Sequence, residues 1–202
     1  LARAQALRQR GGAKEKATTS TRSHQARHGP RHRTAIVAGR FKKGCANMVK
    51  ELEVGGKAPA LFLPDQSGNP VSLKDFAGKQ VVLYFYPKDD TPGCTKESCD
   101  FRDAEALIKK AGGVILGVSF DGQESHTKFI KKFTLPFTLL SDEDKVAAKA
   151  YGVYKEKNMY GKKYWGIERS TFVIDQAGKL KAIFRKVRVN SGVDEVLAAL
   201  KA

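Results

Sequence analysis

The sequence predicts an α/β domain of three layers, in which helices cover both faces of a central mixed sheet. Between residues 81 and 150, short apolar stretches of strand composition alternate with stretches whose apolar residues recur at helical spacing. Near the end of the chain, two strand-like stretches flank a short turn and precede a last helix. The alternation implies right-handed crossovers between parallel strands, and the closing hairpin adds an antiparallel pair.

Charge sets the first quarter of the chain apart from the rest. Residues 1–50 hold 13 of the 37 Lys and Arg and only Glu15 of the 21 acids, a net charge of 13 − 1 = +12, whereas the remainder carries 24 − 20 = +4. Residues 1–47 have almost no apolar periodicity, so we expect a disordered basic leader followed by a compact domain over residues 48–202. The formal charge of +16 therefore does not indicate a nucleic-acid-binding domain.

Three interpretations of this leader stay open: an organelle transit peptide, a basic arm for an anionic partner, and a start placed upstream of native initiation at Met48. His24, His28 and His32 recur every four residues, a spacing that would gather metal ligands on one face of a helix. Because nothing around them predicts a helix or a carboxylate ligand, we interpret this stretch as a solvated basic tract. Cys45 lacks a reactive setting and is interpreted as a bystander thiol.

The first half of the domain predicts a hairpin, a buried central strand and a long helix. The expected elements are strands within 58–65 and 70–73, a connection over 74–78, a strand over 81–86, and a helix from Thr91 to Gly112. Thr91 is a good N-cap, and Pro92 suits the first helical position, where a missing N–H costs nothing. Four apolar residues of this helix recur at spacings of three and four and are expected to face the core: Phe101, Ala104, Leu107 and Ile108.

The second half of the domain continues the alternation. The expected elements are a strand over 113–120, a helix from its cap Asp121 to about Phe133, a strand over 135–142, a helix capped by Ser141 or Asp142, a polar loop or irregular hairpin over 153–168, a hairpin around the turn 175–179, and a helix over 191–202. Aromatic residues embedded in the polar segment are typical of a functional loop. The order of the elements fits a thioredoxin-like topology.

Residues 81–102 hold the candidate chemistry. An apolar strand there runs into a polar turn and then into the first turn of the long helix, which carries Cys94. A thiol in that position faces unpaired backbone N–H groups and the positive end of the helix dipole, and both favour the thiolate. The sequence therefore predicts an activated nucleophile at Cys94.

Pro87, Thr91 and Cys94 stand in the spacing Pro-x-x-x-Thr-x-x-Cys, and three ordered segments follow them: SDEDK, EKNMYGKKYWGIERSTFVID, and RKV before the last helix. From about residue 52 to residue 202, the chain resembles the peroxiredoxins, specifically the peroxiredoxin Q or bacterioferritin comigratory protein subfamily. The resemblance implies a thiol peroxidase that reduces hydrogen peroxide and organic hydroperoxides in antioxidant defence and cell redox homeostasis. It implies Cys94 as the peroxidatic cysteine and Cys99 as the resolving cysteine of an intramolecular disulfide.

Other residues suit the same chemistry. A thiolate that attacks one peroxide oxygen leaves negative charge on the other, so the site needs donors aimed at both oxygens. The Thr91 hydroxyl can point into the pocket, and Pro87 is expected to shape the loop and exclude water. The resemblance implies that Arg169 supplies the cation, with a planar fork that can donate to sulfur and oxygen together. Without the resemblance, Arg169 is more simply a surface cation, and Glu97 could pair with Arg102.

Cys99 cannot reach Cys94 while the helix is intact. Five helical positions, at about 1.5 Å and about 100° each, separate the two Cα atoms by about 8 to 9 Å and place the residues on roughly opposite faces. A disulfide needs Cα atoms within about 7 Å. We therefore expect the first turns of the helix to unwind after Cys94 is oxidised to sulfenic acid, so that a folded and a locally unfolded state alternate.

The implied partners are a peroxide substrate and thioredoxin or a related dithiol reductant. No cofactor or metal is expected, because the two cysteines lack metal-ligand spacing and His126, the only His of the domain, is interpreted as structural. No apolar run approaches the roughly 20 residues of a membrane helix, and neither membrane nor nucleic acid is an expected partner. A monomer is expected, with a dimer left open.

The compartment depends on the leader. The domain alone resembles bacterial cytoplasmic proteins, whereas a transit peptide over residues 1–47 would indicate plastid or mitochondrion. A rival functional class is a redox-sensing or anion-binding protein. In such a protein the basic leader carries the function, and the cysteine pair only switches that function. That class predicts salt-dependent nucleic-acid binding that is lost with the leader.

Overall fold

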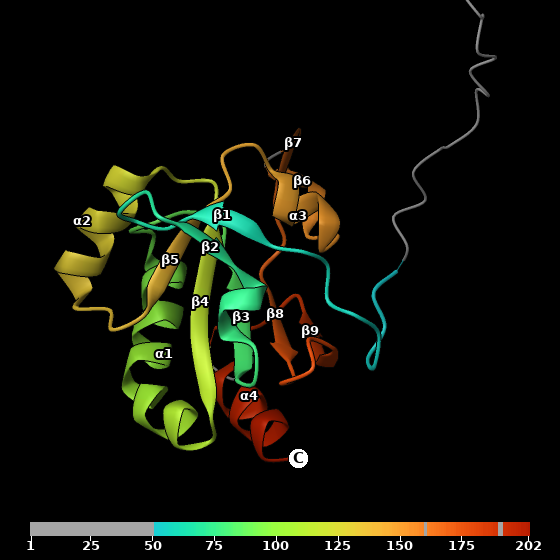
Figure 1. Cartoon of the computed structure of the whole chain (residues 1–202). Helices are drawn as coiled ribbons and strands as arrows, with labels where there is room; N and C mark the ends of the chain where they lie inside the picture. Colours follow the sequence, from blue (N-terminus) through green and yellow to red (C-terminus); the bar gives the residue numbers. More distant parts are fainter. Residues whose placement is uncertain (1–50, 160, 190–191) are drawn as a thin grey trace, which may run out of the picture. The chain divides into compact units, whose positions relative to one another are not determined.

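The computed structural model describes residues 51–159, 161–189 and 192–202, and a five-stranded sheet lies at their centre (Figure 1). The strand order is β5-β4-β3-β8-β9. These strands are β3 (Gln80–Phe85), β4 (Gly113–Ser119), β5 (Thr138–Ser141), β8 (Ser170–Ile174) and β9 (Leu180–Arg185). The interpretations of the leader, of Cys45, and of His24, His28 and His32 lie outside the described residues.

β3 occupies the middle of the sheet because its side chains from Val81 to Phe85 are all apolar or aromatic and buried. It pairs in parallel with β4, which pairs in parallel with β5. On its other side β3 pairs antiparallel with β8, which pairs antiparallel with β9. The mixed sheet is therefore parallel where helices cross over and antiparallel at the closing hairpin, as predicted.

Helices and short strands cover both faces of this sheet (Figure 1). The helices are α1 (Pro92–Lys110), α2 (Gln123–Phe133), α3 (Val146–Ala150) and α4 (Gly192–Lys201), and the outer strands are β1 (Phe62–Pro64), β2 (Pro70–Ser72), β6 (Tyr154–Met159) and β7 (Lys162–Ile167), with a 3-10 turn at Leu73–Phe76. α1 and α4 pack on one face through Phe101, Ile108 and Val196. α3 and the β1–β2 hairpin pack on the other through Ala148 and Leu63. The three-layer, thioredoxin-like fold class is confirmed.

Close packing explains a glycine in the sheet. A Cβ on Gly117 of β4 would stand 2.6 Å from Leu139 Cδ2 and 2.7 Å from the ring of Tyr84. Contacts that short do not occur between real side chains, so this position accepts only glycine without a shift of β5 or of the ring.

Two expectations about α1 and α2 differ from the structure. Leu107 is 56% exposed, because only the Phe101, Ala104 and Ile108 stripe of α1 faces the sheet. Asp121 is not the cap of α2, whose N-cap is Gly122. The Asp121 carboxylate instead accepts the backbone N–H of Asp89, in the loop after β3, at 2.8 Å.

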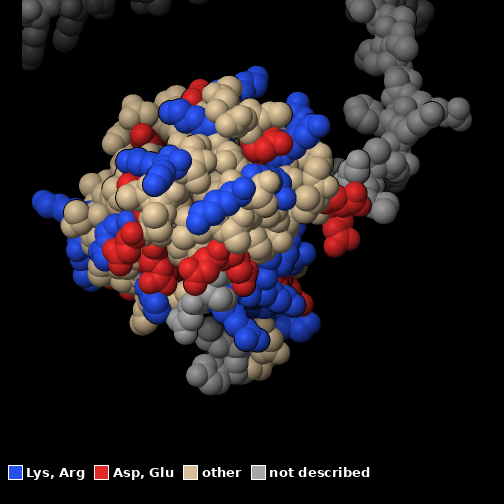
Figure 2. All heavy atoms as spheres, turned by 90° about the horizontal axis from the view of Figure 1, so that it is seen from below, with Lys and Arg blue, Asp and Glu red and all other residues tan. Residues whose placement is uncertain are grey.

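The polar segment over 153–168 is a regular antiparallel hairpin of β6 and β7, with all six residues of one strand paired to the other. The expected cap of the helix after β5, Ser141 or Asp142, is wrong, because the N-cap of α3 is Lys145. The Asp142 carboxylate nevertheless accepts the backbone N–H groups of Ala147 (3.1 Å) and Ala148 (2.7 Å). Acidic and basic side chains lie side by side on the face of the molecule shown in Figure 2, in keeping with the small net charge of residues 51–202.

Candidate active site

The site lies where β3 ends and α1 begins. Pro87 follows β3 and is half-buried, and the polar turn after it leads to Thr91 at the N-cap position of α1. Cys94 is the third residue of the helix, and only 1% of it is exposed. The thiol therefore lies within the first helical turn, beside backbone N–H groups that have no helical acceptor.

Thr91 begins the helix without capping it through its side chain. Its backbone is extended, with φ −96° and ψ 147°, but its hydroxyl makes no cap hydrogen bond to α1. The hydroxyl donates instead to the carbonyl of Lys88 at 3.0 Å. Because its hydrogen is engaged, the Thr91 oxygen offers acceptor lone pairs to any O–H group that enters the site.

Arg169 lies against the thiol. Its Nη2 donates to Cys94 Sγ at 3.3 Å, and its Nη1 donates to a Glu97 carboxylate oxygen. Burial alone would lower the pKa of Arg169, but the negative Glu97 and Cys94 groups outweigh it and raise that pKa. The structure thus places a fixed positive charge at the sulfur, and Arg169 is not the free surface cation that the residue type alone would suggest.

Glu97 is the partner that holds this arginine. It lies one helical turn after Cys94 and is 3% exposed, and its Oε1 has no hydrogen-bond partner in the described part of the chain. Burial raises the pKa of the Glu97 carboxyl from 4.5 to about 7, although Arg169 opposes the shift. The suggested pair with Arg102 is wrong, because Arg102 donates to Asp103 (2.9 Å) and to the Phe133 carbonyl (2.9 Å).

Cys99 lies in the same intact helix and is partly exposed. Both Cys94 and Cys99 are free thiols in this structure. The structure therefore holds the pair in the arrangement that the helix geometry predicts for the folded state, with no disulfide between them.

A buried polar network fixes the turn that carries Thr91. The Asp89 carboxylate accepts the Tyr86 hydroxyl (2.7 Å) and the Ser125 hydroxyl (2.7 Å), and it lies 2.9 Å from His126 Nδ1. The backbone N–H of Asp89 donates to the Asp121 carboxylate at 2.8 Å, which is why Asp121 is unavailable as a helix cap. Burial by itself would raise the pKa of Asp89, but its bonds to His126, Tyr86 and Ser125 lower it.

Val189 and Lys157 also border the site, from segments distant in the sequence. A Cβ on Gly93 would stand 3.5 Å from Arg169 Nη2 and 3.7 Å from Val189 Cγ2, ordinary van der Waals distances, so the helix start lies directly beside both side chains. Lys157 of β6 donates to the Ile167 carbonyl, two residues before Arg169. Burial, and then the charge of Arg169, lower the pKa of Lys157.

The AhpC/TSA family profile matches residues 54–183, which include Cys94, Thr91 and Arg169. The chain is a peroxiredoxin of this family. It is 54% identical to the putative peroxiredoxin bcp of Coxiella burnetii over 149 residues, which are 74% of this chain and 99% of that protein. It is 52% identical to peroxiredoxin Bcp of Bacillus subtilis over 150 residues, 74% of this chain and 96% of that protein.

Among solved structures, this peroxiredoxin is similar to the bacterioferritin comigratory protein of Xanthomonas campestris, which is described as having an alkyl peroxide reduction activity. The identity is 45% and the TM-score 0.69, over 74% of this chain and 98% of that one. These relatives place the chain in the peroxiredoxin Q/Bcp subfamily. It is a peroxidase, an oxidoreductase of antioxidant function.

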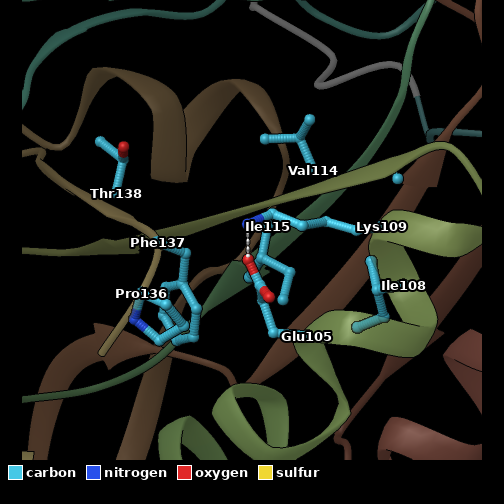
Figure 3. A pocket seen from close by; sticks show the side chains of 9 residues that line it. Glu105, Ile108, Lys109, Val114, Ile115, Pro136, Phe137 and Thr138 are labelled. Atoms are coloured by element: carbon cyan, nitrogen blue, oxygen red, sulfur yellow. Dashed lines mark ion pairs between the residues drawn. The ribbon is translucent and has the colours of Figure 1, made fainter. Parts of the chain in front are cut away.

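Cavities elsewhere on this peroxiredoxin are separate from the thiol. Figure 3 shows one of about 130 Å³ between α1, β4 and residues 136–138, beside the ion pair of Glu105 and Lys109. Another, of about 320 Å³, lies by Leu73, Phe76 and the turn between β8 and β9. Neither is lined by Cys94 or Arg169.

The described residues contain no helix long and apolar enough to cross a membrane. They also contain no group of three or more His, Cys, Asp or Glu side chains arranged to hold a metal ion.

Some residues of the peroxiredoxin site carried a usable sequence signal, and others did not. Glu97 follows Cys94 at a spacing of three, which on a helix shares a face with it, so its presence beside the thiol could have been foreseen. Asp89 and His126 are separated by 37 residues, and only the packing of α2 against β5 brings them together. Nothing in the sequence pattern predicts that contact.

Proposed function

We propose that this peroxiredoxin reduces hydrogen peroxide and organic hydroperoxides at Cys94. The observation that carries the proposal is the 3.3 Å contact between Arg169 Nη2 and Cys94 Sγ within the first turn of α1. A guanidinium and free helix N–H groups both favour thiolate over thiol. The activity named for the Xanthomonas campestris relative supports alkyl peroxides as one substrate class.

In the first step, the Cys94 thiolate attacks one peroxide oxygen and the O–O bond breaks. Cys94 becomes sulfenic acid and the peroxide becomes water or an alcohol once its leaving oxygen takes up a proton. Arg169 stabilises the charge that develops on oxygen, and the Thr91 oxygen, whose hydrogen is bound to Lys88, accepts the peroxide O–H. Pro87 and the turn after it exclude water from the thiol.

In the second step, Cys99 resolves the sulfenic acid. Its thiolate attacks Cys94 Sγ, a disulfide forms, and hydroxide leaves as water. The start of α1 must open first, because an intact helix keeps the two Cα atoms about 8 to 9 Å apart. Thr95 and Lys96 bring little apolar packing to oppose this opening, whereas the buried Ser98 must give up its 3.1 Å hydrogen bond with the Tyr84 hydroxyl.

Thioredoxin or a related dithiol protein then reduces the disulfide. Residues 48–202 are sufficient for this cycle in our proposal, and the leader 1–47 takes no part in it. Similarity to bacterial relatives supports a cytoplasmic location for the domain.

Peroxide consumption with thioredoxin, its reductase and NADPH tests the proposal on three proteins: the full chain, residues 48–202, and Cys94→Ser. We expect the first two to turn over peroxide equally and Cys94→Ser to be inactive. Cys99→Ser should be milder wherever an external thiol can replace Cys99. Activity in Cys94→Ser would refute the assignment, and salt-dependent nucleic-acid binding lost with the leader would favour the sensing function instead.

A further inference from the structure

Two segments flank the arginine that contacts the thiol. β7 ends at Ile167, two residues before Arg169, so the β6–β7 hairpin adjoins it directly. On the other side, the backbone N–H of Val187 donates to the Arg169 carbonyl at 3.1 Å. Val189 continues this segment to the start of α1, within reach of Gly93. We call the strands β6 and β7 of this hairpin together with residues 186–189 the basic rim.

The basic rim is rich in cations that have no acidic partner. The hairpin carries four lysines against the single acid Glu156, a net charge of 4 − 1 = +3, and its lysines are Lys155, Lys157, Lys162 and Lys163. Lys163 pairs with Glu156 at 3.4 Å. In the described part of the chain, no ion pair involves Lys162, Lys186 or Arg188, all of which are exposed.

The same rim exposes two large aromatic side chains, which point to opposite faces of the hairpin because they are consecutive residues of β7. Trp165 is 59% exposed and Tyr164 is 41% exposed. Trp165 lies on Tyr154 with ring centroids 5.1 Å apart, and Tyr154 packs edge-on against Phe120 at 5.8 Å. Trp165 is therefore exposed yet held in one orientation. Rigid Trp and Tyr anchors are typical of the centre of protein interfaces.

We propose that the basic rim is the docking surface for the dithiol protein that reduces this peroxiredoxin, and that this partner presents an acidic face to it. The inference rests on the proposed function, because it requires a disulfide between Cys94 and Cys99. A thiolate of the bound partner forms a bond with one sulfur and displaces the other as thiolate. The second thiolate of the partner then breaks the mixed disulfide, so the partner leaves oxidised and the two thiols regain their protons.

Charge and position favour this occupant over the others. A second copy of the chain would set two basic rims against each other, and the leader, with a net charge of 12 − 1 = +11 over residues 1–47, would be repelled. A small peroxide does not need the indole of Trp165. The rim also lies outside the first turns of α1, so it stays folded as a platform while that helix start opens to form the disulfide.

The test compares two rim variants with a matched control in the full chain. One rim variant reverses two charges, Lys162→Glu with Arg188→Glu, and the other is Trp165→Ala. The control is Lys79→Glu, because Lys79 is also exposed, has no ion pair in the described residues, and precedes β3 at the end of that strand opposite the thiol. The partner is a thioredoxin of net negative charge at low ionic strength, and dithiothreitol replaces it in a parallel assay.

We expect the double reversal to lower kcat/KM for thioredoxin about tenfold, and added salt to shrink the difference. Trp165→Ala should raise KM for thioredoxin, whereas Lys79→Glu should stay within about twofold of wild type. With dithiothreitol, all variants should match wild type, because a small dithiol does not use the rim.

Unchanged kcat/KM for thioredoxin in both rim variants would overturn the docking surface. An equal loss of activity with dithiothreitol would also overturn it, because the defect would then lie in the peroxide chemistry. A dimer of the wild type that dissociates on Trp165→Ala would overturn it as well, because the rim would then bind a second copy of the chain. Failure of the proposed function is distinguishable, because the wild type itself would then consume no peroxide with dithiothreitol.

Discussion

At the residue scale, the thiol that we propose as the nucleophile lies in a chain of contacts in which each group fixes the next. Cys94 contacts Arg169, and Arg169 contacts Glu97, whose carboxyl is buried with one oxygen unpaired in the described part of the chain. A guanidinium can serve two acceptors at once because its donors lie in one plane, and a lysine ammonium cannot match that geometry. The site therefore depends on the shape of Arg169 as well as on its charge.

Arg169→Lys tests this dependence. We expect the rate of sulfenic acid formation to fall about 100-fold, because the substitution loses the donor to the leaving oxygen or the contact with Glu97. Stopped-flow oxidation with hydrogen peroxide in the absence of reductant measures the rate. A loss below about threefold would show that positive charge alone suffices.

Glu97→Gln tests the buried carboxyl through the pH dependence of stability. Burial raises the pKa of Glu97 from 4.5 to about 7 in the folded state, so the folded state binds the extra proton between these values. The proton on Glu97 stabilises the folded state fully below the unfolded pKa of 4.5, and this stabilisation is lost as the pH rises through the folded pKa of about 7.

Relative to Glu97→Gln, the reduced wild type should therefore lose about 3 kcal/mol of unfolding free energy between pH 4.5 and pH 8. Urea denaturation at a series of pH values gives this difference. Parallel pH profiles for the two proteins would contradict the raised pKa.

At the scale of elements, the start of α1 joins a fixed turn to the segment that opens in the proposed cycle. The turn before it is fixed by Asp89, which binds Tyr86 of the strand end and Ser125 and His126 of α2. The helix after it buries Phe101 and Ile108, and its first turns also bury Glu97 and Ser98, which contact Arg169 and the Tyr84 hydroxyl. Opening at the helix start therefore breaks these two contacts, while the turn keeps its own.

Amide hydrogen exchange tests this division of the helix. Residues 92–102 should exchange faster in the disulfide form than in the reduced form, while residues 104–110 keep their protection, because the bond forces the first turns open. The Cys99→Ser variant, treated with the same peroxide, is the control. Equal protection of residues 92–102 in both redox states would contradict local unfolding.

Asp89→Asn tests the anchor. The substitution removes the charge that receives three side-chain contacts, and we expect a loss of about 1 to 3 kcal/mol in stability together with slower sulfenic acid formation. Ser125→Ala is a matched control that removes one donor and should cost about 1 kcal/mol. A stable Asp89→Asn protein with an unchanged oxidation rate would show that the turn does not need its anchor.

At the scale of the whole molecule, periodicity and turn chemistry predict the strands and helices of the three layers and their order, but not the regular pairing of β6 with β7. The buried run over 81–86 and the helix start at Thr91 predict where the candidate site lies, because both signals are local in the sequence. The pairing of Arg169 with Cys94 joins positions 75 residues apart and came from the family resemblance, since no local pattern encodes it. Asp121 was misassigned because its local context suits a cap, whereas the fold brings the Asp89 backbone within 2.8 Å.

The leader carries most of the charge of the whole chain, and the proposed function gives it no role. Removal of residues 1–47 should leave kcat/KM for hydrogen peroxide within about twofold of the full chain, because that peroxide is neutral and small. The coupled assay with thioredoxin and its reductase provides the comparison. A larger loss on truncation would assign the leader a part in catalysis.

The most direct test of the account is a single turnover on fully reduced protein with one equivalent of hydrogen peroxide and no reductant. After alkylation of the remaining thiols, peptide mass spectrometry locates the products. The account predicts that two thiols are lost, that a disulfide joins Cys94 to Cys99, and that Cys99→Ser yields sulfenic acid at Cys94 that a dimedone probe traps. Peroxide consumed with Cys94 still alkylated, or a disulfide that leaves out Cys94, would contradict it.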